Sequence, residues 1–119
     1  MKYLAALILL FATMARATSV RDYESKTIHE RTEIVSNFLD KMIADIRVNN
    51  PQLASEIHDW FNDVPAGKPI PEGLEKFEIE LGALDMRAKE GRADLSKVQV
   101  EGVIVYVVKQ KFAPQLAKQ

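Results

Sequence analysis

The sequence predicts an α+β domain in which a long amphipathic helix and a shorter helix precede an antiparallel β-hairpin or small curved sheet. Three observations predict it. Apolar residues recur at helical spacing in residues 27–49, prolines and glycines interrupt the chain at 64–73, and β-branched and aromatic side chains concentrate in residues 97–112. An all-α bundle of about four helices is the alternative.

Residues 1–17 have the organisation of a secretory signal peptide. Lys2 supplies the positive charge, residues 4–12 form a short apolar core, and Ala15-Arg16-Ala17 gives the small-any-small pattern of a cleavage site. The apolar run falls short of the ~20 residues that span a bilayer. We therefore expect no membrane span, cleavage before Thr18, and a secreted, extracellular protein formed by residues 18–119 as a single domain.

A long helix is predicted from the spacing of its apolar residues and from signals at its two ends. Thr27 and Glu30 have the spacing of a capping box, in which each side chain accepts a hydrogen bond from a free amide at the helix start. Asn49, Asn50 and Pro51 end the helix, because proline disfavours helical geometry in the residue before it. The apolar face consists of Ile28, Val35, Phe38, Leu39, Met42, Ile43 and Ile46.

A shorter helix is expected directly afterwards. Asn50 can cap this helix and Pro51 suits its first position, while its apolar side is formed by Leu53, Ile57, Trp60 and Phe61. The breakers in residues 64–73 then predict a linker. It separates a helical part at 22–63 from a second part at 74–112.

Residues 74–88 fit two different elements. Leu74, Phe77, Leu81, Leu84 and Ala88 form a helical stripe, whereas Lys76–Leu81 alternates polar and apolar residues as a half-buried strand does. The valine-rich segment that follows favours a strand and needs a partner strand upstream. We therefore predict a hairpin that turns at Glu90 and Gly91.

The run Val103–Val108 is apolar on both faces if it is a strand, so it requires a cover on each side. The long helix can supply one cover. A second sheet, a second copy or another protein, or an apolar ligand can supply the other. The alternative is that the chain's own helices cover both sides.

Residues suited to catalysis or metal binding do not assemble into a recognisable motif. His29 and Glu33 share a helix face, but a zinc-protease helix would need a second histidine at position 33, and His58 is distant. The serines lie in no nucleophile elbow and no pair of carboxylates is set apart by its environment. We expect no enzyme activity, no cofactor and no metal.

The charge of the chain argues against a nucleic-acid partner. Loss of Lys2 and Arg16 with the signal peptide would leave 14 basic and 17 acidic residues, a net charge of −3. Nucleic-acid binders carry a basic surplus or stripe. The sequence contains no cysteine, which excludes thiol chemistry and zinc ribbons.

Two stretches, Lys76–Asp85 and Gly91–Val103, follow the signal peptide, long helix and linker in an order typical of one family. The chain resembles the N-terminal part of secreted arthropod proteins of the group 7 mite allergen and juvenile-hormone-binding type, within the tubular lipid-binding superfamily. The resemblance covers residues 34–108. It implies a long helix wrapped in curved antiparallel sheet, with apolar ligands held between them.

We therefore expect a secreted, allergen-like, non-enzymatic protein that binds a lipid or other apolar small molecule between its helix and its hairpin. Burial of hydrocarbon at about 25 cal/mol per Å² would drive binding. The alternative is a small all-helical secreted module that contacts another protein, with Val103–Val108 as a buried or interfacial helix. The candidate lining residues are Phe38, Met42, Phe77, Ile79, Leu81, Val98, Val100 and Tyr106.

Overall fold

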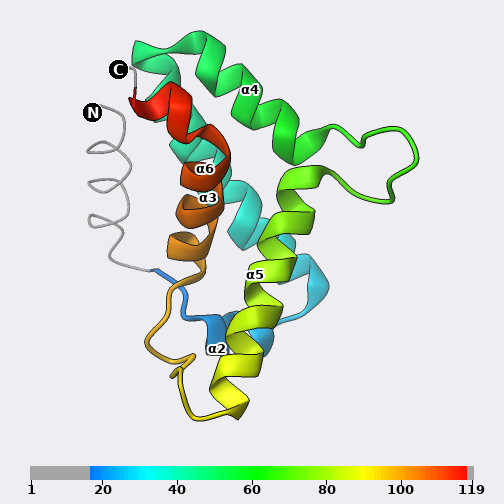
Figure 1. The fold of residues 1–119 in the computed structure, drawn as a ribbon, viewed down its shortest axis with the longest axis vertical. Coiled ribbons are helices and arrows are strands. Elements are labelled where there is room, and N and C mark those ends of the chain that lie inside the picture. The colour runs from blue at the N-terminus through cyan, green and yellow to red at the C-terminus, as the bar shows by residue number, and fades with distance from the viewer. Residues whose placement is uncertain (1–16, 118–119) are drawn as a thin grey trace.

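The computed structural model describes residues 17–117, and over this range the chain is helical (Figure 1). Extended pairing in these residues is confined to one isolated bridge between Ser19 and Gln99. The α+β prediction is therefore wrong, and the all-α alternative describes the fold. The helices are α2 (Val20–Glu24), α3 (Ile28–Asn49), α4 (Pro51–Asn62), α5 (Glu72–Lys89) and α6 (Val100–Ala117).

Helices α3 and α4 begin and end where local signals predict. The Thr27 side chain accepts a hydrogen bond from the Glu30 amide, and the Glu30 side chain accepts one from the Thr27 amide, which confirms the capping box. Asn50 ends α3 and caps α4, since its side chain accepts from the Leu53 amide at 3.1 Å. Pro51 occupies the first turn of α4.

Helix α5 replaces the first strand of the predicted hairpin. Its inward side is the helical stripe, with Phe77 buried and Leu74, Leu81 and Leu84 packed at the edge of the core. The predicted strand alternation fails at Ile79, whose side chain is 55% exposed. The alternation in Lys76–Leu81 is therefore a coincidence of six residues within a longer pattern of helical period.

A turn does form at Glu90 and Gly91, but it ends a helix. The Arg92 amide donates to the Arg87 carbonyl at 2.8 Å and the Gly91 amide donates to the Ala88 carbonyl at 3.1 Å. These two bonds, with Gly91 at φ 74°, form a Schellman motif, which satisfies the last carbonyls of α5. The chain then runs to α6 and not back along α5 as a strand.

Helix α6 replaces the second strand. Its residues Val103, Ile104, Val105, Val107 and Val108 are all buried, and only Tyr106 of that run is exposed. A helix that is apolar on nearly every side is stable when other helices surround it, so packing outweighs the β propensity of valine. The chain's own helices thus cover the valines and Ile104 of this run. The helix bends at Phe112, two residues before Pro114, where the missing proline amide breaks the hydrogen-bond ladder.

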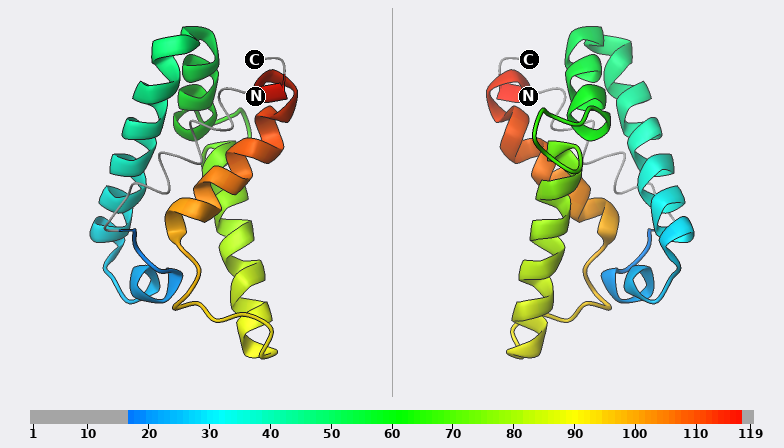
Figure 2. Two further views of the ribbon diagram at one scale, coloured as in Figure 1. Left: turned by 90° about the vertical axis from the view of Figure 1, so that its left-hand side faces the viewer. Right: turned by 90° about the vertical axis from the view of Figure 1, so that its right-hand side faces the viewer.

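The helices assemble around one core to which each of them contributes buried side chains. Figure 2 shows α3 on one side of the molecule and α5 on the other, with α4 joining them at one end and α2 lying at the opposite end. Helix α4 packs along α3 and also against α5, while α6 packs against α5. Aromatic contacts join two other pairs of helices. The Trp60 ring of α4 meets Phe112 of α6 edge-on at 5.5 Å, and Tyr23 of α2 meets Phe77 of α5 at 6.1 Å.

The residues before α2 lie along the segment that enters α6. The Val100 amide donates to the Thr18 carbonyl and the Val20 amide donates to the Val98 carbonyl, each at 2.8 Å. The predicted signal peptide lies almost entirely outside the described residues, so it stays a prediction. None of the helices described for residues 17–117 is long and apolar enough to cross a membrane.

Candidate functional site

The eight residues predicted to line a ligand cavity do not surround one space. Phe38, Met42, Phe77 and Val100 are buried and belong to the hydrophobic core. Leu81 and Val98 pack at the edge of the core. Ile79 and Tyr106 point to solvent, with 55% and 47% of their surfaces exposed. The groove between a helix and a hairpin, on which the prediction depended, is therefore absent from residues 17–117.

Two of these residues do meet in a shallow depression beside α6. Val98 and Tyr106 line a cavity of 580 Å³ together with Gly102, Val103 and the aliphatic Leu84 of α5. Charged side chains stand on its edge, from Glu80, Arg87 and Lys97. An apolar ligand would meet these charges there.

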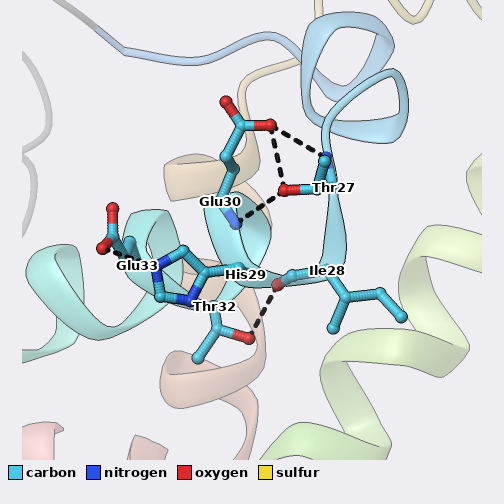
Figure 3. A network of polar contacts seen from close by, with 6 residues as sticks. All are labelled: Thr27, Ile28, His29, Glu30, Thr32 and Glu33. Atoms are coloured by element: carbon cyan, nitrogen blue, oxygen red, sulfur yellow. Dashed lines mark hydrogen bonds and ion pairs between the residues drawn. The ribbon is translucent and has the colours of Figure 1, made fainter.

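The start of α3 places polar residues at the molecular surface (Figure 3). The imidazole of His29 lies 3.1 Å from a carboxylate oxygen of Glu33, which confirms that the two share a helix face. Both side chains are exposed. Within residues 17–117 no group of three or more histidine or acidic side chains could hold a metal ion.

The cap also lowers the pKa of Glu30. The Thr27 backbone amide and the Thr27 hydroxyl both donate to its carboxylate at 3.0 Å, and these hydrogen bonds favour the charged form. The capping box fixes the N-terminus of α3 at Ile28. In this position 81% of the surface of Ile28 is exposed.

A second hollow is a groove between α3 and α5, with a volume of 710 Å³. We call it the α3–α5 groove. Helix α3 packs along α4, whereas α5 packs against α4 and α6. The N-terminal halves of α3 and α5 therefore stand apart and leave the groove between them. It is lined by Tyr23, Ile28, Arg31, Thr32, Val35, Ser36, Leu39, Phe61, Asn62, Val64, Pro71, Leu74, Phe77 and Glu78.

Apolar side chains form most of this groove. Val35, Leu39 and Phe77 are buried, whereas Ile28 and Val64 are 81% and 55% exposed. Among the eight residues predicted from sequence, only Phe77 belongs to the groove. The sequence prediction missed the other groove residues, because the groove depends on how two helices diverge. Ile28, an apolar residue that directly follows the N-cap of α3, was the one local sign of an exposed apolar position.

Tyr23 and Arg31 both line the groove and contact each other. The Arg31 guanidinium donates to the Tyr23 carbonyl at 3.1 Å and to the Glu24 carbonyl at 2.5 Å, and its carbon lies 5.6 Å from the centre of the Tyr23 ring. Burial raises the pKa of Tyr23, with Arg31 opposing this shift and Glu78 adding to it. Arg31 is thus engaged in holding α2 onto α3.

Glu78 is the acidic group of the groove that lacks a partner cation. Among residues 17–117, no Lys, Arg or His side chain lies within ion-pairing distance of its carboxylate. The surrounding stretch of α5, residues 72–85, carries five carboxylates and a single lysine. The groove therefore joins an apolar lining to an acidic edge.

Comparison with known proteins adds no relative, because no family model, no curated protein and no solved structure matches the chain.

Proposed function

We propose that this chain is a secreted, non-enzymatic, all-helical protein that binds an amphipathic, basic helical segment of a partner protein in the α3–α5 groove. The observation that carries the proposal is the exposure of Ile28 and Val64 beside an apolar groove of 710 Å³. Exposed aliphatic side chains gathered along a groove are typical of sites that bind protein or ligand.

The shape of the groove favours a helical segment. The groove residues of α3 run from Ile28 to Leu39, which corresponds to about 16 Å of helix at 1.5 Å per residue. Three turns of a partner helix have this length, and such a helix presents anchors at positions i, i+3 or i+4, and i+7. Each anchor would remove apolar surface of the groove from water.

The charge of the groove favours a basic segment. Glu78 has no partner cation in the described residues, and its neighbours on α5 are mainly acidic. A lysine or arginine at the edge of a bound helix would pair with this carboxylate, and complementary charge raises association rates and sets specificity. The apolar face of a basic, amphipathic helix would pack on the apolar lining, and its basic residues would pair with Glu78.

A small apolar ligand fits this arrangement less well. Ligand pockets enclose most of a bound molecule, whereas the lining of this groove includes the largely exposed side chains of Ile28 and Val64. The lipid-binding hypothesis also required a β-hairpin as one side of the binding site, and residues 72–89 and 100–117 are helical instead. Binding of a fatty acid is therefore the competing outcome of the experiment below.

The experiment selects binders from a displayed library of random 16-residue peptides and measures the affinity of the enriched peptides by fluorescence anisotropy. The decisive variants are Val64→Ser in the groove and Ile79→Ser on the opposite side of α5. Both wild-type side chains are 55% exposed, so the two changes have similar effects on the fold. A third variant, Glu78→Lys, reverses the charge of the edge.

Enriched peptides are expected to carry apolar residues at helical spacing with flanking Lys or Arg. Val64→Ser should weaken their binding about tenfold, the effect of truncating a good anchor. Glu78→Lys should also weaken it, and Ile79→Ser should leave it unchanged. The proposal fails if no peptide depends on the groove, if both serine variants bind alike, or if oleate binds with defined stoichiometry and displaces the peptides.

A further inference from the structure

Glu101 is the one charged side chain among residues 17–117 that is buried, with 3% of its surface exposed. It lies in the first turn of α6, where the helix dipole favours a negative charge. No Lys, Arg or His side chain of the described residues lies within ion-pairing distance. A buried carboxylate without a cation loses hydration that a neutral hydrogen bond only partly replaces.

The group that does meet Glu101 is a backbone nitrogen at the start of the chain. The nitrogen of Thr18 donates to Glu101 Oε1 at 3.0 Å. Its position is fixed from both sides, because the Thr18 carbonyl accepts from the Val100 amide and Ser19 pairs with Gln99. Gln99 also carries a buried side-chain oxygen with no hydrogen-bond partner in the described residues. This corner is thus rich in acceptors and poor in positive charge.

Thr18 is also the residue that the predicted cleavage site would place at the N-terminus. We propose that cleavage of the Ala17–Thr18 bond turns the Thr18 nitrogen into an α-ammonium group that forms a partly buried ion pair with Glu101, and so stabilises the fold only after processing. A peptidase would hydrolyse the bond with one water molecule. Ala17 would leave with the new carboxylate, and the Thr18 nitrogen would acquire the protons that complete the ammonium.

The consequence is a fold that gains stability when the leader is removed. In the precursor the same nitrogen is a neutral amide and offers one hydrogen. In the mature chain it is a cation with three, and it is positively charged at neutral pH because α-amino groups titrate near pH 8. A precursor of lower stability would remain easier to unfold for export. The inference rests on the predicted export of the chain and not on the occupant of the α3–α5 groove.

The test compares chains that begin at Thr18 with chains that begin at Ala15, each with Glu101 and with Glu101→Gln. Within residues 17–117 the buried apolar residues run from Val20 to Leu116, and all of these chains contain them. Urea unfolding at pH 7 gives the folding equilibrium constant of each chain. Glu33→Gln serves as the control, because the side chain of Glu33 is 62% exposed.

With Glu101 present, the Thr18 chain should have a folding equilibrium constant about tenfold higher than the Ala15 chain, as expected when a hydrogen bond gains a buried charge. With Glu101→Gln the Thr18 and Ala15 chains should be equally stable. With Glu33→Gln the Thr18 chain should remain more stable than the Ala15 chain. The proposal is overturned if the start has no effect in the Glu101 protein, or if the effect survives Glu101→Gln.

A second measurement keeps the proposal testable if Glu101→Gln does not fold. Mass spectrometry of the exported protein should find Thr18 as the first residue, and any other N-terminus overturns the proposal. Peptide binding in the α3–α5 groove should be the same for both starts. Failure of the ion pair is therefore distinguishable from failure of the groove.

Discussion

Replacing each of two glycines of α5 with alanine should change stability in opposite directions. At Gly73 an added Cβ would lie 2.7 Å from Cδ1 of Phe61 and 2.9 Å from the carbonyl oxygen of Trp60. The carbonyl is backbone and cannot rotate away, so α5 must shift from the end of α4. At Gly82 a Cβ would meet no atom within 4 Å.

The magnitudes follow from two opposing effects. Alanine gains about 0.5–1 kcal/mol over glycine inside a helix, because glycine loses more backbone entropy on folding. Overpacking a tight contact costs about 1–3 kcal/mol. Gly82→Ala should therefore raise the free energy of unfolding by about 0.5–1 kcal/mol. Gly73→Ala should lower it by about 1–2 kcal/mol, since its gain at the first turn is small.

Thermal and urea unfolding of both variants measure this difference. A change of 1 kcal/mol moves the melting temperature of a domain of this size by about 4–8 °C, so the two variants should melt well apart on either side of the parent. If Gly73→Ala is as stable as Gly82→Ala, the close approach of α5 to α4 is wrong. The reasoning about how α5 is placed would then be refuted.

Three further predictions concern the core and the ionisable groups. Ile104→Ala should cost about 2–5 kcal/mol in urea unfolding because Ile104 is fully buried, whereas Tyr106→Ala, at a side chain 47% exposed, should cost far less. The pKa of Glu30 is lowered in the folded protein. The stability that this carboxylate adds is therefore present above its ordinary pKa of 4.5 and is lost as the pH falls through the folded pKa. Glu30→Gln should remove that part of the loss of stability in acid. The pKa of Glu24 is raised by burial and by Asp85, so its contribution to stability is present below pH 4.5 and is lost as the pH rises through the folded pKa. Asp85→Asn should consequently raise the melting temperature at pH 7.

Local chemistry was sufficient to predict α3 and α4, the two helices of the predicted helical part. The capping box at Thr27 and Glu30, and the shared role of Asn50 as the end of one helix and the cap of the next, depend on residues within one turn of each other. Such signals act the same way in any tertiary context. The bounds of α3 and α4 accordingly match the sequence prediction.

The second half failed because its signals depend on what surrounds them. Gly91 fits a hairpin turn and a helix C-terminus equally well, and the basic Arg87 and Lys89 in the preceding turn are the sign that favoured the helix. The valines of α6 favour a strand in isolation, but the helix they form is enclosed by the rest of the chain. Tertiary packing, which no local pattern contains, decided this segment.

The α3–α5 groove could not be predicted from the sequence, because it too depends on tertiary packing. Its lining residues come from α2, the first half of α3, the end of α4, the linker that follows and the start of α5. They meet because α3 and α5 diverge from their shared contact with α4. The predicted residues Phe38, Met42 and Val100 were correctly identified as apolar positions facing inward, but they pack against other side chains. Apolar periodicity marks the core and does not separate it from a groove.

The central claim, that residues 100–111 form a helix whose valines and Ile104 are buried against the chain's own helices, is tested most directly by NMR of a chain formed by residues 18–119. The fold predicts helical ¹³Cα shifts through this segment, contacts between Hα of each residue and the amide three residues later, and slow hydrogen exchange at Val103–Val108. Cross-strand contacts between residues 77–83 and 98–104, with extended shifts in both segments, would contradict it.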